Sequence, residues 1–319
     1  MSASRELTAD DQVMYEREGY VIVRNLFSLA EADVLRTAIS QDAVVERRVM
    51  AMRDGAGRAA RLSLWHYVQP ATCYGALAAS RRMVNAARAL MASCGVHDEP
   101  YHMHTKIILK EPRTGGAFSV HQDFGYWYEC GTLDPNAMLS CIVAVDAADL
   151  ANGCLQVLAR SHRLGRISHG HAGEQAGADP EMVELARARL QTVVCELSPG
   201  DVLFTHSNLI HWSGPNASDR WRRAIIVAYN GTGNPPTAKG AGLIPMPHPL
   251  VVVDDARLLA IGPVGHDAET AGDAGWLSQE KNVATFGQRG DDYSVATEDF
   301  AARAAQQLAA TAAAAGDAK

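Results

Sequence analysis

The 319-residue sequence lacks the patterns that would place a protein in a membrane, in the secretory pathway or on nucleic acid. No run of about 18 apolar residues occurs, so no segment is expected to span a bilayer. The first residues, MSASRELTADDQ, contain no apolar stretch resembling a signal peptide. The net charge of −7 and the absence of long basic runs argue against a partner bound through its phosphate backbone.

Paired cysteine motifs are also missing. The six cysteines are scattered without CxxC spacing, which together with the N-terminus predicts a cytoplasmic protein with reduced thiols. Hydrophobic residues make up 47% of the chain and charged residues 20%, as in ordinary globular proteins that bury a sizeable core. Because single cores stop growing near about 250 to 300 residues, and no internal repeat is present, we predict one domain, 1–319, with appendages.

Residues 1–100 are predicted to form a mostly helical flank. Thr8 with Asp11, and Ser28 with Glu31, have the spacing of two helix-capping boxes. A short strand is expected at 20–23 between these helices, and a further helical stretch at about 76–91.

Short β-type runs separated by turn residues occupy 101–230 and indicate an antiparallel barrel or sandwich. The runs are 105–109, 118–121, 139–145, 155–158, 193–197, 202–205 and 224–229. A helical insertion is predicted near 179–191, where Asp179-Pro180 precedes an apolar stripe. Residues 231–319 are expected to form a loop-rich cover that ends in an Ala-rich helix at 300–315. The predicted fold class is therefore mainly β with flanking helices.

The triplet His121-Gln122-Asp123 closes one of these β-type runs. Residues two apart on an extended segment face the same side, so His121 and Asp123 can act together. With a distant histidine they would complete a facial triad that leaves half of the coordination sphere of an Fe(II) ion open. About one such triplet is expected by chance in a chain with twelve histidines, and a hydrogen-bonding pair at the barrel rim is the alternative.

Two histidines compete for the third ligand position within the segment PGDVLFTHSNLIHWSGPN at 199–216. His206 and His211 are an odd number of residues apart, so a regular strand would place them on opposite faces. Arg222 and Arg223 then open an apolar run, and one guanidinium should point inward. A buried arginine needs an anion, which a dicarboxylate cosubstrate or an internal salt bridge would supply. Ser213 lies close enough in sequence to support the same carboxylate.

These residues resemble the phytanoyl-CoA dioxygenase family of Fe(II)- and 2-oxoglutarate-dependent oxygenases. The matching stretches are HTKIILKEP at 104–112, HQD at 121–123, NGCLQVL at 152–158, SH at 161–162, the segment 199–216 and RRAIIVAYN at 222–230. The resemblance implies a double-stranded β-helix (jelly-roll, cupin-like) core. It also implies His121, Asp123 and His211 as the catalytic iron ligands.

The same resemblance implies the residues that bind the cosubstrate. The family's 2-oxoglutarate arginine maps to Arg222, which leaves Arg223 pointing outward, and Gln122, Ser213 and Lys106 occupy further family positions at this cosubstrate. Alternation along the strand then makes His104 a pocket residue if Lys106 points inward. Four aromatic residues after HQD or beside His211 are further candidates for substrate contact: Phe124, Tyr126, Trp127 and Trp212.

The implied reaction uses Fe(II), 2-oxoglutarate and O2 and releases succinate and CO2. Because Asp123 is present, where related halogenases carry a small residue, we expect hydroxylation. The stretch 126–136 departs from the acyl-CoA enzymes, so the expected substrate is a small-molecule metabolite or natural-product intermediate. A phosphonate or other reduced phosphorus compound, contacted by Arg113, Arg160 and Arg163, is the alternative. A non-catalytic cupin-like binding protein and a zinc hydrolase are alternatives of other classes.

Overall fold

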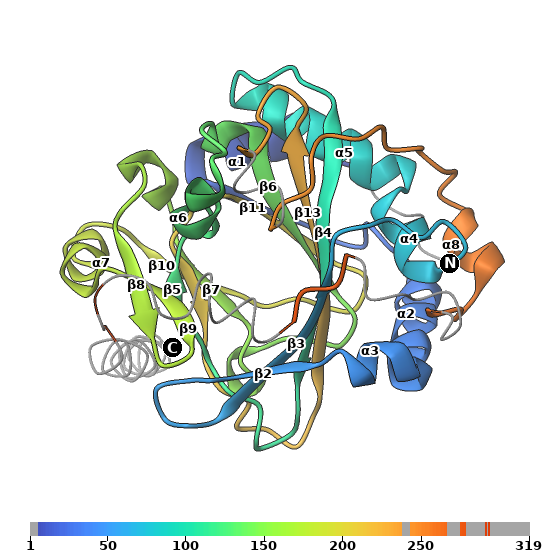
Figure 1. The fold of residues 1–319 in the computed structure, drawn as a ribbon, viewed down its shortest axis with the longest axis horizontal. Helices are drawn as coiled ribbons and strands as arrows, with labels where there is room; N and C mark the ends of the chain where they lie inside the picture. Colours follow the sequence, from blue (N-terminus) through green and yellow to red (C-terminus); the bar gives the residue numbers. More distant parts are fainter. Residues whose placement is uncertain (1–5, 238–242, 267–274, 279–290, 292, 294–319) are drawn as a thin grey trace, which may run out of the picture.

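Two antiparallel sheets that face each other form the centre of the molecule (Figure 1). The computed structural model describes residues 6–237, 243–266, 275–278, 291 and 293. The larger sheet has the strand order β1-β11-β6-β13-β4-β3-β2, the smaller one has the order β10-β7-β12-β5, and β8 and β9 form a separate hairpin. Every pairing between these strands is antiparallel.

The strands of the larger sheet come from the whole length of the described chain. They are β1 (Tyr20–Val23), β2 (Met50–Arg53), β3 (Ala59–Trp65), β4 (Pro100–Lys110), β6 (Met138–Ala144), β11 (Val202–His206) and β13 (Arg222–Gly231). The smaller sheet contains β5 (Phe118–His121), β7 (Leu155–Leu158), β10 (Thr192–Cys195) and β12 (His211–Ser213), and the hairpin consists of β8 (His169–Ala172) and β9 (Gln175–Ala178).

Most of the helices pack on the outer face of the larger sheet, whereas those at 123–127 and 180–187 pack in other hydrophobic clusters. The α-helices are α1 (Ala9–Glu18), α2 (Leu29–Gln41), α3 (Ala43–Arg47), α4 (Cys73–Ala78), α5 (Arg81–Ser93), α6 (Asp123–Trp127), α7 (Pro180–Arg187) and α8 (Arg257–Ile261). Short 3₁₀ turns lie at Tyr128–Cys130, Pro135–Ala137, Leu150–Asn152 and Ser161–Leu164. Within the described residues no helix is both long and apolar enough to cross a membrane.

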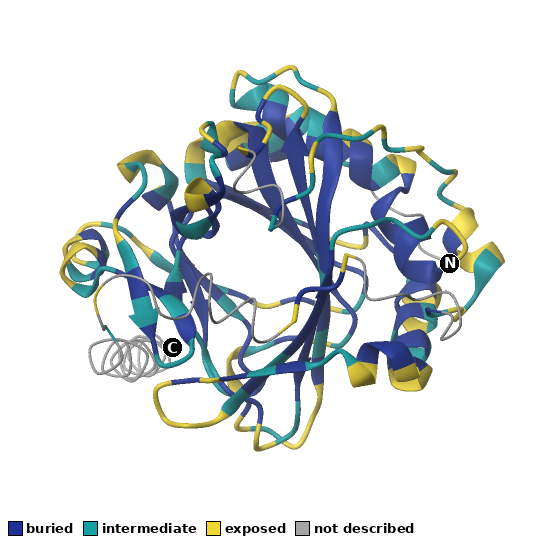
Figure 2. Ribbon diagram, in the orientation of Figure 1, coloured by how far each residue is buried: buried dark blue, intermediate teal, exposed yellow. Residues whose placement is uncertain are grey.

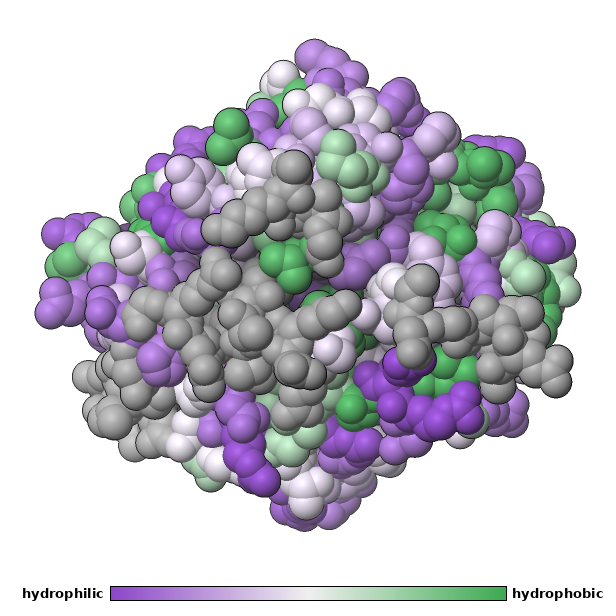
Figure 3. All heavy atoms as spheres, viewed as in Figure 1, coloured by the Kyte–Doolittle hydropathy of each residue, from purple (hydrophilic) through white to green (hydrophobic). Residues whose placement is uncertain are grey.

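Strand alternation divides the larger sheet into two buried faces. Ile107 and Ile225 pack with the helices in one cluster, whereas their neighbours Ile108 and Ala224 pack in a second cluster between the sheets. The strands and the inner sides of the helices are accordingly buried in Figure 2, and hydrophilic side chains cover much of the rim of the face in Figure 3. A sheet that is buried on both faces holds its inward side chains in fixed positions.

Most of the predicted elements are present. Thr8 with Asp11, and Ser28 with Glu31, both form capping boxes. Each of the seven predicted β-type runs falls on a strand, although 139–145 and 193–197 extend past the ends of β6 and β10. The stretch predicted as one helix at 76–91 is divided into α4 and α5 at Ser80, whose hydroxyl donates to the Leu77 carbonyl oxygen. The expected insertion forms α7.

The first hundred residues contribute more than helices. β1, β2 and β3 from this part of the chain join the larger sheet, and β2 and β3 were not predicted. In β3 the consecutive side chains of residues 62–65 are buried, Ser63 among them, so both faces of this strand are covered. The helix expected at 300–315 lies outside the described residues.

Candidate active site

Pairing of β5 with β12 brings together two histidines that are ninety residues apart in the sequence. His121 lies directly opposite His211 in the register, and the two ring centroids are 4.3 Å apart. Asp123 begins helix α6 immediately after β5. The distance from Asp123 Oδ1 is 3.6 Å to His121 Nε2 and 4.0 Å to His211 Nε2. The fold therefore gathers the three predicted ligands at one point.

Both imidazoles are oriented by the backbone. His121 Nδ1 is 2.7 Å from the Ser119 carbonyl oxygen, and His211 Nδ1 is 2.9 Å from that of Leu209. Because a carbonyl oxygen only accepts, each Nδ1 carries the hydrogen and each Nε2 presents its lone pair to the cluster. Burial, followed by the neighbouring His121, lowers the pKa of His211 to about 4. A neutral ring of this kind is the form that binds a metal.

The Asp123 carboxylate is fixed by two hydroxyl groups. Tyr126 donates to Oδ1 over 2.6 Å, and Ser140 donates to Oδ2 over 2.7 Å. Burial acts to raise the pKa of Asp123, but the neighbouring His121, His211 and Lys106 hold this pKa well below its usual value. The group is therefore an oriented, ionised carboxylate.

The donor set and its spacing fit Fe(II). One donor atom from each of His121, Asp123 and His211 lies within 4.8 Å of the other two. With bonds of about 2.0 to 2.2 Å, one ion can touch two donors that are up to about 4.4 Å apart, and Asp123 Oδ1 lies 3.6 and 4.0 Å from the two imidazole nitrogens. Two imidazoles and one carboxylate form the facial triad that leaves positions open for further ligands.

Removing one of the hydroxyl donors should weaken metal binding without abolishing it. Since partners of metal ligands typically contribute about 10- to 100-fold in affinity, we expect Tyr126→Phe or Ser140→Ala to lower Fe(II) affinity by about 10-fold. Competition with a chelator of known affinity measures this change. A variant with the Fe(II) affinity of the unchanged protein would show that the hydroxyl does not support the ligand.

An inner cavity adjoins the three ligands and extends to Arg222. Its lining includes His121, Asp123, His211, Ser213 and Arg222. Arg222 is 3% exposed, and its Nε has no hydrogen-bond partner in the described part of the chain. Arg222 takes part in no ion pair within the described residues. A buried, unpaired guanidinium in the wall of a cavity is suited to bind an anion.

Arg223 has the opposite orientation. Its Nε lies 2.7 Å from Asp146 Oδ2, its Nη2 lies 3.0 Å from Oδ1 of the same carboxylate, and its Nη1 donates to Ser40. Adjacent residues of a strand point to opposite faces, so the pairing of Arg223 outside leaves Arg222 inside. His206 likewise points away from the ligands and contacts Asn136.

Sequence reasoning missed one charged residue of this region, Lys110. It is fully buried and lies directly opposite Arg222 in the pairing of β4 with β13. Its Nζ donates to Ser213 Oγ over 2.9 Å and also to the carbonyl oxygen of Gly214. The alternation that relates His104 to Lys106 and Ile108 would have identified it, because Lys110 continues the same face.

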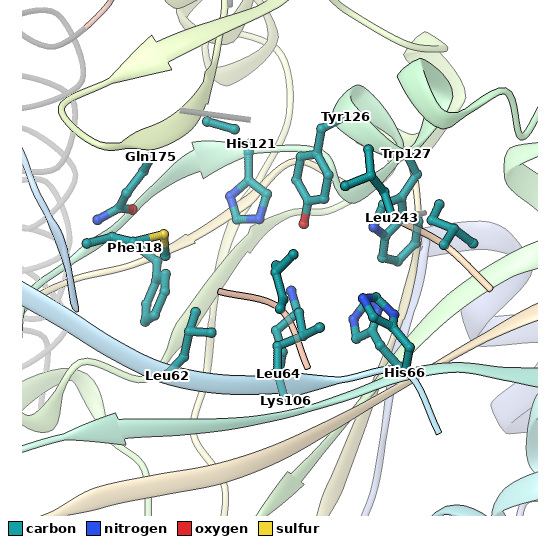
Figure 4. Close-up of a pocket in the computed structure, with 15 residues that line it drawn as sticks. Leu62, Leu64, His66, Lys106, Phe118, His121, Tyr126, Trp127, Gln175 and Leu243 are labelled. Carbon is teal, nitrogen blue, oxygen red and sulfur yellow. The ribbon is translucent and has the colours of Figure 1, made fainter. Parts of the chain in front are cut away.

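An outer cavity also adjoins His121 (Figure 4). His121, Tyr126 and Trp127 project from one wall, whereas Leu64 and Lys106 project from the facing sheet. His104 also lines this cavity, and its Nε2 is buried without a hydrogen-bond partner among the described residues. Lys106 lines both cavities, so it lies at the boundary between them.

Several predicted residues lie elsewhere. The Gln122 amide donates to the carbonyl oxygens of Gly165 and Asn208 and accepts from the Ile167 backbone, so it fixes loops and lines neither cavity. Phe124 packs in a small hydrophobic cluster with Met103 and also lines neither cavity. Trp212 lines the inner cavity rather than the outer one.

The three arginines considered for a phosphorus compound are surface residues. Arg113 pairs with Asp219, Arg160 with Glu18, and Arg163 with Glu16. Their side chains are more than half exposed, with values of 62%, 58% and 54%. They line neither cavity, and each is already paired with a surface acid, so the structure gives no support to a role in binding a substrate anion.

Comparison with known proteins identifies relatives of the whole catalytic region. The model of the family "Phytanoyl-CoA dioxygenase (PhyH)" matches residues 15–224. Ectoine dioxygenase from Bordetella parapertussis is 27% identical over 256 residues, which cover 76% of this chain and 81% of that protein. Human peroxisomal phytanoyl-CoA dioxygenase is 24% identical over 249 residues, which cover 70% and 68% of the two chains.

Solved structures show the same fold. EctD from S. alaskensis in its apoform superposes with a TM-score of 0.65 at 22% sequence identity, covering 80% of this chain and 90% of that one. Further structures of EctD contain bound Fe, or 2-oxoglutarate with 5-hydroxyectoine. The two facing antiparallel sheets are thus the double-stranded β-helix core that was predicted.

The family match removes the alternatives of a non-catalytic binding protein and a zinc hydrolase. It covers both histidines, the carboxylate and Arg222, and the triad fits the iron that the family uses. The chain belongs to the phytanoyl-CoA dioxygenase (PhyH) family and is a dioxygenase that uses Fe(II), 2-oxoglutarate and O2.

Proposed function

We propose that this enzyme hydroxylates a small-molecule metabolite or natural-product intermediate and releases succinate and CO2. The observation that carries the proposal is the inner cavity, in which an oriented His121–Asp123–His211 cluster and the unpaired cation of Arg222 share one space. A 2-oxo dicarboxylate has one end that binds a metal and another that pairs with a guanidinium. The inner cavity contains both a cluster that can hold the metal and a guanidinium that can pair with the distal carboxylate.

In this proposal His121, Asp123 and His211 hold the iron, which with 2-oxoglutarate supplies the activation of O2. Arg222 and Ser213 would bind the distal carboxylate of the cosubstrate, because both line the inner cavity. Lys106, at the boundary of the two cavities, would contact the cosubstrate from the substrate side. Gln122 would act only indirectly, through the loops that it holds.

The outer cavity would receive the substrate. Its walls combine apolar side chains, such as Leu62, Leu64 and Leu243, with the polar groups of His104 and Tyr126. Such a lining suits a small molecule with an apolar body and a few polar groups, and Trp127 offers an aromatic surface for it. Burial lowers the pKa of His104 well below its usual value, so its ring is neutral. Its unpartnered Nε2 would form a hydrogen bond with the substrate.

The relatives differ in the molecules that they are named for. They include ectoine dioxygenases, phytanoyl-CoA dioxygenases and, at 32% identity over 134 residues, a 2-aminoethylphosphonate dioxygenase. Arg113, Arg160 and Arg163 are paired at the surface, and among the described residues no arginine lines the outer cavity, so we favour the metabolite or natural-product class.

Anaerobic addition of Fe(II) and 2-oxoglutarate tests the proposal. We expect the weak visible charge-transfer band of the iron–2-oxoglutarate chelate, and succinate on exposure to oxygen. A metabolite panel screened for accelerated succinate formation should then reveal the substrate class. If the metal-loaded protein showed neither the band nor succinate, the proposed function would be wrong.

A further inference from the structure

The outer cavity has no acid in its wall. Among the described residues that line it, Lys106 is charged and none is an aspartate or a glutamate. Asp123 lines only the inner cavity, where its oxygens accept from Tyr126 and Ser140. A cation that entered the outer cavity would lose its hydration without an acid to compensate the charge, and aromatic faces would offset only part of this cost.

Two polar residues of the same lining are uncharged. Burial lowers the pKa of His104 well below its usual value, so its ring is neutral. The Gln175 amide accepts from the Ser119 backbone and donates to the Ala117 carbonyl oxygen, so strand β5 and the residue before it occupy both of its ends. His104 is therefore left to form a hydrogen bond without offering a charge.

Three apolar residues of the lining come from the C-terminal part of the chain. They are Leu243, Ile244 and Leu277. All three lie beyond residues 15–224, which the family model matches, so membership of the family does not predict them. They contribute to the wall of the proposed substrate cavity with residues of this chain's own.

Backbone pairing fixes Leu277 beside the larger sheet. Its N–H donates to the Leu64 carbonyl oxygen over 3.0 Å, and the ring of Trp276 packs against that of Trp65 with centroids 5.0 Å apart. Leu277 is buried in one hydrophobic cluster with Leu62 and Leu64, which also line the cavity. These leucines form an apolar wall in a fixed position.

We propose that the outer cavity selects an uncharged molecule with an apolar face, and that Leu243 and Leu277 are specificity-determining residues for it. The apolar face would lie against the leucines, and a polar group would bind to His104. Amines, amidines and zwitterions would be rejected. The inference rests on the proposed function, because Lys106 is engaged by the cosubstrate only if 2-oxoglutarate occupies the inner cavity.

Binding of three cyclohexyl compounds to the protein loaded with Fe(II) and 2-oxoglutarate, without oxygen, tests the inference. 2-Cyclohexylethanol is uncharged, 2-cyclohexylethylamine is a cation at neutral pH, and cyclohexylacetate is an anion. In calorimetric titrations we expect the alcohol to bind at least about 10-fold more tightly than either ion, because neither charge finds a free partner in the cavity.

Variants that add an acid to the apolar wall should reverse the selection. Leu277→Glu should bind the amine about 10-fold more tightly than the unchanged protein does, because a carboxylate then faces the ammonium group. Leu277→Gln has a similar size without the charge and should keep the preference for the alcohol. Leu243→Glu tests the second position. The control is Leu259→Glu on helix α8, where the side chain is 49% exposed, and it should leave all three affinities unchanged.

Four results would overturn the inference. In the unchanged protein these are equal binding of the alcohol and the amine, tighter binding of the acetate than of the alcohol, and no binding of the alcohol. The fourth is that Leu277→Glu and Leu243→Glu proteins, shown by circular dichroism to be folded, gain no affinity for the amine. Absence of the charge-transfer band with 2-oxoglutarate, together with absence of succinate, would instead overturn the proposed function.

Discussion

Replacing Asp123 with alanine should abolish substrate oxidation. The carboxylate is the only anionic group of the His121–Asp123–His211 cluster, and it is held by Tyr126 and Ser140. Since loss of a partner outside the ligand set already costs about 10- to 100-fold in metal affinity, loss of the ligand itself should cost more than about 100-fold. Succinate formation with and without substrate measures the loss of oxidation. The iron content after dialysis measures the loss of metal affinity.

The control for this experiment is another aspartate at the surface. Asp219 is 78% exposed and pairs only with the exposed Arg113, so Asp219→Ala should retain iron and activity. Circular dichroism should show that both variants are folded. An Asp123→Ala protein that retains one tightly bound iron and normal succinate formation would contradict the assignment of Asp123 as a ligand.

Replacing Arg222 with alanine should mainly raise the concentration of 2-oxoglutarate that the enzyme requires. A guanidinium that pairs with a carboxylate in a buried site contributes about 1.5 to 3 kcal/mol per charged hydrogen bond, and each 1.4 kcal/mol changes affinity about 10-fold. We therefore expect an increase of about 30- to 100-fold in the KM for 2-oxoglutarate. The KM for the substrate should change little, because Arg222 lines only the inner cavity.

Arg223→Ala provides the matched control in the adjacent position. Its side chain is bound to Asp146 and Ser40 on the outer face of β13, so this variant should keep the 2-oxoglutarate requirement of the unchanged enzyme. If Arg223→Ala raised the requirement and Arg222→Ala did not, the register of β13 deduced from the structure would be wrong.

Local patterns in the sequence were sufficient for much of the fold. Capping boxes at Thr8 and Ser28 depend on residues three positions apart, and the run at 118–121 is bounded by glycines and the HQD triplet, so each could be recognised without tertiary information. β8 and β9 could not be recognised in this way, because HGHA and QAGA are short and rich in glycine and alanine. They exist because they pair with each other and pack beside β5.

In the candidate site, too, local patterns predicted some features and tertiary contacts decided others. The resemblance implied that Lys106 and Arg222 face the site, and the alternation of strand residues then placed Arg223 outward, as the structure has them. Strand alternation did not show that the Gln122 amide is occupied by hydrogen bonds to the backbone, or that Phe124 packs into a hydrophobic cluster. The reason is that helix α6 starts at Asp123 and ends the alternation of β5. Strand alternation also gave no indication of which arginines would be neutralised at the surface by acids that are distant in the sequence.

The sequence by itself determined the ligand types, their order and the strand that carries His121, because these depend on residue chemistry and on spacing within a few positions. Only the tertiary structure decided how the ligands meet. Pairing of β5 with β12 sets His121 against His211, and pairing of β4 with β13 sets Lys110 against Arg222. The physical reason is that both contacts arise from hydrogen bonding between strands about a hundred residues apart, whose register no local pattern specifies.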